Sequence, residues 1–221
     1  SGCGSTDLAL LCKTVKAKKC SFGLAFDGDA DRCLAVDEKG NPIDGDQLIA
    51  IMSNHLKNEG LLTNDTVVVT VMSNLGFFEF AKKNGISVEV TKVGDRYVLE
   101  KMIEKSFCIG GEQSGHIILK AFANTGDGQL SGLLISAVIK NTGLKMSEAA
   151  GVMQRFPQVM INNKVTADKK EMLEKDEEIA ALIQKYTDEL GENGRILVRP
   201  SGTEPLVRVM VEGKSFEKIN K

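Results

Sequence analysis

Hydrophobic residues are spaced in two different ways at the start of the chain. Apolar positions recur at helical intervals over residues 7–15, which predicts an amphipathic helix there. The stretches 21–26 and 33–36 are almost entirely apolar, which is typical of short buried strands. A turn is expected at residues 38–41, where Gly and Asn favour a tight change of direction. The polar loop between the two strands therefore lies inside a β-rich segment.

From Asp46 onward, apolar stretches of strand length alternate with helical patterns. The β-branched stretch 66–71 is typical of a buried strand in a parallel sheet. The expected elements, in chain order, are a helix from Asp46 to Leu56, strand 66–71, helix 76–83, strand 87–92, helix 96–105, strand 107–109 and helix 128–139. This alternation predicts an α/β layered domain with a mainly parallel or mixed sheet.

The pattern changes again near residue 155. A strand over residues 157–165 is followed by a long helix over 168–190, whose apolar residues form one stripe. Two further strands, 195–199 and 206–211, flank a loop of small and polar residues. This order predicts a small α+β domain at the end of the chain.

Composition and charge narrow the classes of partner. The 221 residues carry 28 basic and 30 acidic side chains, and this net charge of −2 offers no basic field for nucleic acid. No stretch predicts a signal peptide or a membrane span, so no membrane partner is expected. The five cysteines are odd in number and form no C-x-x-C pair, which favours buried free thiols in the cytoplasm.

The polar loop between the first two strands contains the strongest chemical signal. Its sequence is Asp27-Gly28-Asp29-Ala30-Asp31-Arg32. Three carboxylates this close repel one another unless a cation neutralises them, and their hard oxygen ligands favour Mg²⁺. The small residues between them allow the backbone to direct all three towards one point. Arg32 adds a cation that can hold a phosphate beside the metal.

Three other interpretations of this loop compete with a magnesium site. An EF-hand also begins D-x-D-x-D, with Glu38 at loop position twelve, but Arg32 occupies position six, where that loop needs Gly. A phosphatase of the dehalogenase type would use Asp27 as its nucleophile, yet Asp31 stands where its Thr is expected. A solvated acidic turn explains poorly why the charges directly follow an apolar strand. We favour the magnesium site.

Two later loops carry further candidate chemistry. Residues 110–116, Gly-Gly-Glu-Gln-Ser-Gly-His, follow a predicted strand and offer groups that hydrogen-bond hydroxyls. Residues 199–205, Arg-Pro-Ser-Gly-Thr-Glu-Pro, combine hydroxyls, a Gly-containing turn and an arginine, with Arg208 beyond, which suits phosphate. Each loop taken alone also fits an ordinary turn. The shorter Gly126-Asp127-Gly128 lacks the rest of a nucleotide-binding loop, so we favour a helix-start turn there.

These three loops, in this order, resemble the α-D-phosphohexomutase family, and the resemblance covers essentially the whole chain. Four segments are similar in particular to members that interconvert glucosamine 6-phosphate and glucosamine 1-phosphate, namely 3–6, 93–98, 112–116 and 125–128. Members that act on glucose or mannose phosphates are the second interpretation, and a non-catalytic sugar-phosphate-binding module is the third. The resemblance implies an intramolecular phosphotransferase whose partner is a small sugar phosphate.

The resemblance also assigns roles to individual residues. The Mg²⁺ ligands would be Asp27, Asp29 and Asp31. Arg32 would lie beside the phosphoryl group, and His116 would lie near the reacting oxygen as a candidate proton carrier. Glu112 and Ser114 would contact sugar hydroxyls. The substrate's other phosphate would be held by Arg199, Ser201, Gly202, Thr203 and Arg208.

The family fold has four domains around a central cleft, and the resemblance places this chain in its later part. Residues 1–41 would be the tail of domain two with the metal loop, 42–155 an α/β domain three with a mixed sheet, and 156–221 most of an α+β domain four. The family's phosphoserine loop, of the Thr-Ala-Ser-His-Asn-Pro type, does not occur in the sequence, which begins at Ser1. We therefore expect a fragment that binds Mg²⁺ weakly, does not turn over, and needs the N-terminal part of the same enzyme. The oligomeric state is not predicted.

Overall fold

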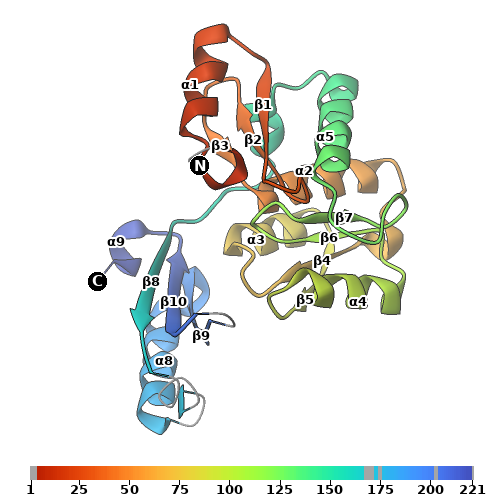
Figure 1. Cartoon of the computed structure of the whole chain (residues 1–221). Helices are drawn as coiled ribbons and strands as arrows, with labels where there is room; N and C mark the ends of the chain where they lie inside the picture. The colour runs from red at the N-terminus through yellow and green to blue at the C-terminus, as the bar shows by residue number, and fades with distance from the viewer. Residues whose placement is uncertain (1–3, 167–171, 174–175, 202–203, 221) are drawn as a thin grey trace. The chain divides into compact units, whose positions relative to one another are not determined.

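The computed structural model of the chain describes residues 4–166, 172–173, 176–201 and 204–220 (Figure 1). The chain forms two compact units, Ser1–Arg155 and Phe156–Lys221. Each unit has its own sheets and helices. The predicted further division of the first unit at residue 42 stays a prediction.

The first unit begins with a helix and a small antiparallel sheet. In chain order, the elements are η1 (Gly4–Thr6), α1 (Ala9–Lys18), β1 (Phe22–Phe26), β2 (Cys33–Asp37) and β3 (Pro42–Ile43), with the sheet order β1-β2-β3. Both predicted strands are confirmed. Phe26 lies opposite Cys33 in the β1–β2 pair. The acidic loop therefore closes this hairpin, and strand pairing holds both of its ends.

The helix α2 (Gly45–Asn58) confirms the helix predicted after the hairpin. Asp44 caps it: its carboxylate accepts a hydrogen bond from the Gln47 backbone N–H at 3.0 Å, and the Gln47 side chain accepts one from the Asp44 N–H. The apolar face of α2 is buried in the main core of the unit, together with Ala35 from the first sheet and Val67 from the second. One core thus joins both sheets.

The second sheet of the unit is mixed, as predicted. Its strand order is β5 (Ser87–Thr91), β4 (Thr66–Thr70), β6 (Ile109–Gly111), β7 (Ile117–Leu119). β4 pairs in parallel with β5 and β6, whereas β6 and β7 are antiparallel. Along β4, Val67 and Val69 enter the main core, and Val68 packs with Met102 of α4 (Asp95–Lys105). Burial on both faces explains why the three central residues of this strand are all valines.

The other helices of the first unit agree closely with the pattern. α3 (Leu75–Lys83), α4 and α5 (Gly128–Thr142) each begin within one residue of the predicted start. Asp127 caps α5, because its carboxylate accepts a hydrogen bond from Leu130 N–H at 2.9 Å, and this confirms the helix-start turn. The strand predicted at 107–109 lies two residues later as β6. The pattern did not predict η1, β3, η2 (Thr63–Asp65), β7 or α6 (Met146–Ala150).

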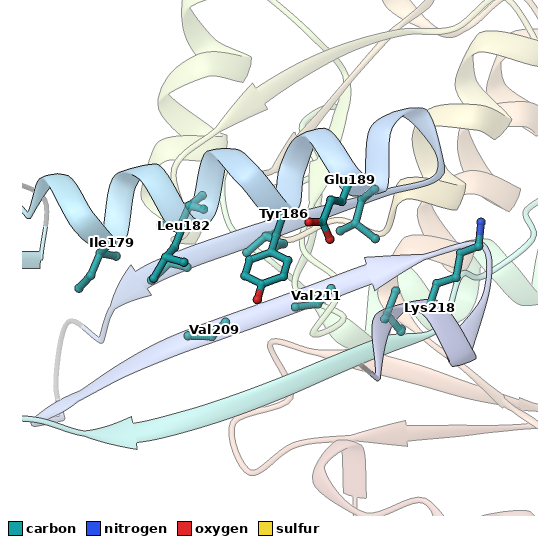
Figure 2. Close-up of a pocket in the computed structure, with 12 residues that line it drawn as sticks. Ile179, Leu182, Tyr186, Glu189, Val209, Val211 and Lys218 are labelled. Atoms are coloured by element: carbon teal, nitrogen blue, oxygen red, sulfur yellow. The ribbon is translucent and has the colours of Figure 1, made fainter.

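The second unit contains an antiparallel sheet with a helix along one face. The sheet order is β8 (Gln158–Lys164), β10 (Leu206–Gly213), β9 (Gly194–Pro200), and the helices are α8 (Glu177–Leu190), η4 (Gly191–Asn193) and α9 (Phe216–Ile219). Figure 2 shows α8 above the sheet, with Leu182 and Tyr186 directed towards Val209 and Val211. The groove between them has a volume of about 550 Å³ and mainly apolar walls.

The single continuous helix predicted over 168–190 is wrong, because the described residues show a break at Asp176. Asp176 has an extended backbone, and its carboxylate accepts hydrogen bonds from Glu178 N–H and Ile179 N–H, so α8 begins only after it. Residues 168–171 and 174–175 of the predicted helix lie outside the described residues. Leu173 falls on the apolar stripe of α8, so the periodicity predicted one helix through Asp176. The capping residue Asp176 instead starts a new helix.

The cysteines are free in the described part of the chain, but they differ in burial. Cys33 is buried, whereas Cys12, Cys20 and Cys108 are partly exposed. The expectation of buried thiols is therefore correct for Cys33 and wrong for these three. Within the described ranges, we find no helix with the length and apolar character needed to cross a membrane.

Candidate functional site

The acidic loop is a tight turn stabilised by its first residue. Oδ1 of Asp27 accepts a hydrogen bond from the backbone N–H of Arg32 at 3.1 Å. The backbone N–H of Ala30 donates to the Asp27 carbonyl at 3.3 Å. Ala30 has a φ of 59°, in the left-handed region that is unfavourable for a residue with a side chain. Contacts around the loop must therefore stabilise this geometry.

The three carboxylates of the loop converge. Asp27, Asp29 and Asp31 each offer one oxygen, and these oxygens lie within 4.8 Å of one another. Asp29 is exposed, and the other two are partly buried. Oδ1 of Asp31 is buried and accepts no hydrogen bond from any residue that the structure describes. Converging oxygens and an unsatisfied carboxylate oxygen fit a hard divalent cation such as Mg²⁺.

Asp27 and Asp31 differ in how readily they ionise. Burial raises the pKa of Asp31, and the neighbouring Asp27 carboxyl raises it further. Burial also opposes ionisation of Asp27, but hydrogen bonds from the Arg32 backbone and from Asp31 outweigh it, and the pKa of Asp27 is lowered. Arg32 Nε lies 3.7 Å from Asp27 and 3.8 Å from Asp31, and its side chain is 44% exposed. A proton in this cluster therefore resides on Asp31 in preference to Asp27.

Two later turns of the first unit contact the acidic loop. The backbone N–H of Cys33 donates to the Gly115 carbonyl at 3.0 Å, and the N–H of Gly128 donates to the Ala30 carbonyl at 2.9 Å. A Cβ at Gly115 would overlap the Cys33 carbonyl oxygen, and one at Gly128 would overlap the loop's own backbone. Both glycines therefore permit an approach that no other residue allows.

His116 lies within this contact and is only 4% exposed. Its backbone forms an isolated antiparallel bridge with Arg32. Its Nδ1 is 3.0 Å from Oδ2 of Asp31, and its Nε2 accepts a hydrogen bond from the backbone N–H of Gly126 at 3.1 Å. We did not assign Gly126 to the site from the sequence, although segment 125–128 carried part of the resemblance, because Gly126-Asp127-Gly128 had a sufficient local explanation as a helix start.

Glu112 and Ser114 lie in the loop after β6, at the carboxyl edge of the parallel strands, where α/β sheets bind ligands. Oε1 of Glu112 accepts a hydrogen bond from Gly94 N–H at 3.0 Å, which ties this loop to the one after β5. The Gln113 carbonyl accepts a hydrogen bond from Gly45 N–H at 2.9 Å. Ser114 is exposed. These contacts order the loop and leave it accessible.

The candidate phosphate site of the second unit lies at one end of the β9–β10 pair. Arg199 and Arg208 are directly opposite each other in the register of these strands. Ser201 is buried, and its hydroxyl accepts a hydrogen bond from Glu204 N–H at 3.2 Å. Glu204 also forms an ion pair with Arg208 at 2.8 Å. A serine just beyond β9 and two arginines opposite each other in the strand register offer donors that suit a phosphate.

The predicted site residues thus gather in two groups, one in each unit. In the first unit, the three aspartates, Arg32 and His116 meet at the acidic loop, and the loop with Glu112 and Ser114 leads directly into His116. In the second unit, the described members are Arg199, Ser201 and Arg208. Gly202 and Thr203 lie outside the described residues. The apolar groove beneath α8 contains none of these side chains.

Three family models match the chain. Residues 4–40 match phosphoglucomutase/phosphomannomutase, alpha/beta/alpha domain II, and residues 44–156 match alpha/beta/alpha domain III. Residues 160–221 match the phosphoglucomutase/phosphomannomutase C-terminal domain. Each of the three matched ranges contains one of the three predicted loops, in the same order along the chain.

Relatives with high identity match over almost the whole chain. The phosphoglucosamine mutase of Caldicellulosiruptor bescii is 52% identical over 219 residues, which are 99% of this chain and 49% of that protein. That of Ruminiclostridium cellulolyticum is 53% identical over 221 residues, which are 100% of this chain and 49% of that protein. The chain therefore spans about half the length of the curated relatives it matches.

Solved structures show the same fold at low identity. The structure described as Aspergillus fumigatus N-acetylphosphoglucosamine mutase in complex with GlcNAc-6P and magnesium has a TM-score of 0.78 at 20% identity, and the match covers 100% of this chain and 51% of that chain. A phosphoglucomutase/phosphomannomutase family protein from Burkholderia thailandensis has a TM-score of 0.79 at 19% identity, covering 98% of this chain and 47% of that chain.

Proposed function

The chain belongs to the phosphoglucomutase/phosphomannomutase family, and from this premise we propose that it is the metal- and substrate-binding part of a phosphoglucosamine mutase. Its substrates would be glucosamine 6-phosphate and glucosamine 1-phosphate. The observation that carries the proposal is the acidic loop, where three carboxylates converge beside Arg32 and one oxygen of Asp31 lacks a donor among the described residues. The choice of an amino sugar rests on the phosphoglucosamine mutases that match the chain.

The acidic loop would hold Mg²⁺ through Asp27, Asp29 and Asp31. When bound there, the metal would neutralise charge on the phosphoryl oxygens, which is the main requirement of phosphoryl transfer. The exposed guanidinium of Arg32 would bind the same phosphoryl group from the protein side. Its two neighbouring carboxylates keep Arg32 near the loop without burying it.

The loop after β6 would orient the sugar. Gly94 N–H engages Oε1 of Glu112, and the second carboxylate oxygen of Glu112 can accept a hydrogen bond from a sugar hydroxyl. Ser114 can both donate to and accept from a hydroxyl, and its exposure makes it reachable. Both roles are orienting roles, and neither residue would take part in bond breaking.

The arginine pair of the second unit would hold the phosphate that does not react. Arg199 and Arg208 face each other across the strand pair, and Ser201 lies just beyond β9. We include Gly202 and Thr203 in this site on the strength of the motif alone. Binding the sugar through a fixed second phosphate would let the enzyme present either O6 or O1 to the same reacting centre.

The phosphoryl carrier would come from elsewhere in the same enzyme. The sequence contains no Ser-His-Asn-Pro loop of the kind that carries the family's phosphoserine. We propose that an N-terminal part of the enzyme supplies this serine as the partner of the present chain.

The four described cysteines of the present chain are free thiols, which supports a reducing compartment, the cytoplasm.

The test uses a full-length enzyme that contains this chain, with its serine phosphorylated. ³¹P NMR should show conversion of glucosamine 6-phosphate into glucosamine 1-phosphate in the presence of Mg²⁺. Asp31→Asn should abolish most of this conversion, whereas Asp188→Asn, at an exposed position on α8, should retain it. A clear preference for glucose or mannose phosphates would refute the amino-sugar assignment. Turnover by the 221-residue chain alone would refute the external phosphoserine.

A further inference from the structure

We propose that His116 is a positioning residue for Asp31: in its neutral Nδ1–H tautomer, it holds the Asp31 carboxylate so that Oδ1 faces the metal. This inference rests on the proposed function, because it concerns one of the proposed metal ligands. It differs from the proton-carrier role that the family resemblance suggested for His116.

The tautomer follows from the two partners of the imidazole ring. The backbone N–H of Gly126 points at Nε2 from 3.1 Å, so Nε2 must present a lone pair. A neutral imidazole then carries its proton on Nδ1. Nδ1 lies 3.0 Å from Oδ2 of Asp31, which can only accept when ionised. The hydrogen bond therefore runs from His116 to Asp31.

The position of the ring is set by backbone contacts on two sides. The His116 backbone is bridged to Arg32, next to Asp31, and the Gly126 backbone is bridged to Ile118, two residues beyond His116. A Cβ at Gly126 would overlap the Nε2 and Cε1 side of the ring. The absence of a side chain at Gly126 thus allows its N–H to contact Nε2 directly.

As a consequence, the two carboxylate oxygens of Asp31 have different roles. Oδ2 accepts the hydrogen bond from His116, while the buried Oδ1 accepts none from the described residues. Burial and the Asp27 carboxyl raise the pKa of Asp31, and the hydrogen bond from His116 opposes both. A carboxylate oriented by an outer hydrogen bond in this way is typical of metal sites.

A proton carrier at the reacting oxygen would instead need an available ring nitrogen. Both nitrogens of His116 have partners within hydrogen-bond distance, and the residue is 4% exposed. The other nearby carboxylate, Oδ2 of Asp95, lies 3.8 Å from Nε2, which is beyond a hydrogen bond. The geometry around the ring thus favours orientation of Asp31 over transfer of a proton.

Two amide substitutions at His116 test the two ring nitrogens one at a time. The Asn amide nitrogen in His116→Asn takes the place of Nδ1, and the Gln amide in His116→Gln takes the place of Nε2. Mn²⁺ alone, followed by electron paramagnetic resonance on the 221-residue chain, is the probe, because it binds the same oxygen ligands. His116→Gln should weaken Mn²⁺ binding by about 10–100-fold, whereas His116→Asn should stay close to the original affinity.

The tautomer itself is measurable without metal. The chain has two histidines, so a long-range ¹H–¹⁵N correlation spectrum contains only the rings of His55 and His116. The proposal expects the unprotonated nitrogen of His116 to be Nε2. Thermal melting of both variants checks that they fold.

Each outcome bears on a different statement. A wild-type chain that does not bind Mn²⁺ overturns the metal site of the proposed function and the role of His116 with it. A wild type that binds, with equal affinity in both variants or an equal loss in both, overturns the positioning role alone. An Nε2–H tautomer of His116 also overturns it, whatever the metal affinities.

Discussion

Arg199 of β9 and Arg208 of β10 lie directly opposite each other in the antiparallel register of the second unit. Like charges in this arrangement repel, and an anion bound between them would relieve the repulsion. At the far end of the same strand pair, Arg195 faces Glu212 and forms an ion pair at 2.6 Å. At one end of the hairpin an arginine thus faces a buried carboxylate, whereas at the other end two arginines face each other and Arg208 forms an ion pair with Glu204, which leaves that end suited to a phosphate.

Replacing Arg208 with Gln should impair phosphate binding far more than folding. Inorganic phosphate should raise the melting temperature of the wild-type chain, and R208Q should lose this rise. Without phosphate, we expect a stability change within about 0.5 kcal/mol, because the side chain is partly exposed and relief of repulsion offsets the lost Glu204 pair. Thermal melts with and without phosphate measure both effects.

Arg195→Gln is the matched control for this prediction. It removes the guanidinium that pairs with Glu212, which is 0% exposed, and should cost roughly 3 kcal/mol. The rise in melting temperature with phosphate should nevertheless persist in R195Q. An undiminished phosphate effect in R208Q would show that the arginine pair is not the anion site.

Gly128→Ala should disturb the acidic loop from outside it. The new methyl group would overlap the backbone oxygens of Arg32 and Ala30, and no side-chain rotation can relieve a clash at Cβ. We expect a loss of about 1–3 kcal/mol in urea unfolding, typical of overpacking, together with weaker Mn²⁺ binding. Gly28→Ala, inside the loop itself, is the control, because no atom outside its own chain neighbours lies within 4 Å of the Cβ that it would add.

The control variant Gly28→Ala should change stability by less than about 0.5 kcal/mol, because its Cβ points into open space. If both substitutions changed the free energy of unfolding equally, the contact between Gly128 and the acidic loop would contribute nothing to stability. The comparison therefore isolates a tertiary contact from the local conformational preference of the loop.

Mg²⁺ binding should weaken as the pH falls, starting above the ordinary range for an aspartate. Burial and then Asp27 raise the pKa of Asp31, so protons compete with the metal for this carboxylate at higher pH than for an exposed one. The sign is a loss of affinity with acidification. Calorimetric titrations at a series of pH values measure it, and Asp31→Asn should flatten this dependence while lowering the affinity.

Cys33 should resist alkylation in the native chain. Burial raises the pKa of its thiol to about 12, so the reactive thiolate is scarce at pH 8. Cys12, Cys20 and Cys108 are partly exposed and should react with iodoacetamide first. Mass spectrometry of a labelling time course, repeated in denaturant, checks the order. Rapid labelling of Cys33 in the native chain would contradict its burial next to the acidic loop.

The sequence predicted most elements of the first unit because their signals are local. Apolar periodicity, β-branched runs and capping residues act within a few positions, and the starts of α3, α4 and α5 follow them closely. The failure at Asp176 has the same origin. There, the prediction followed an apolar stripe that continues past Asp176 and ignored the capping signal of Asp176 itself.

The sequence also predicted the candidate metal site of the acidic loop, because its three carboxylates are close together along the chain. Only the tertiary structure decided what surrounds them. His116 lies 85 residues after Asp31, and it reaches that carboxylate because strand pairing brings the turn at Gly115 against Cys33. Strand register and close glycine contacts depend on how whole faces pack, and no short stretch of sequence encodes them. The sequence by itself therefore determined the candidate metal ligands, and packing determined that His116 lies against one of them, Asp31.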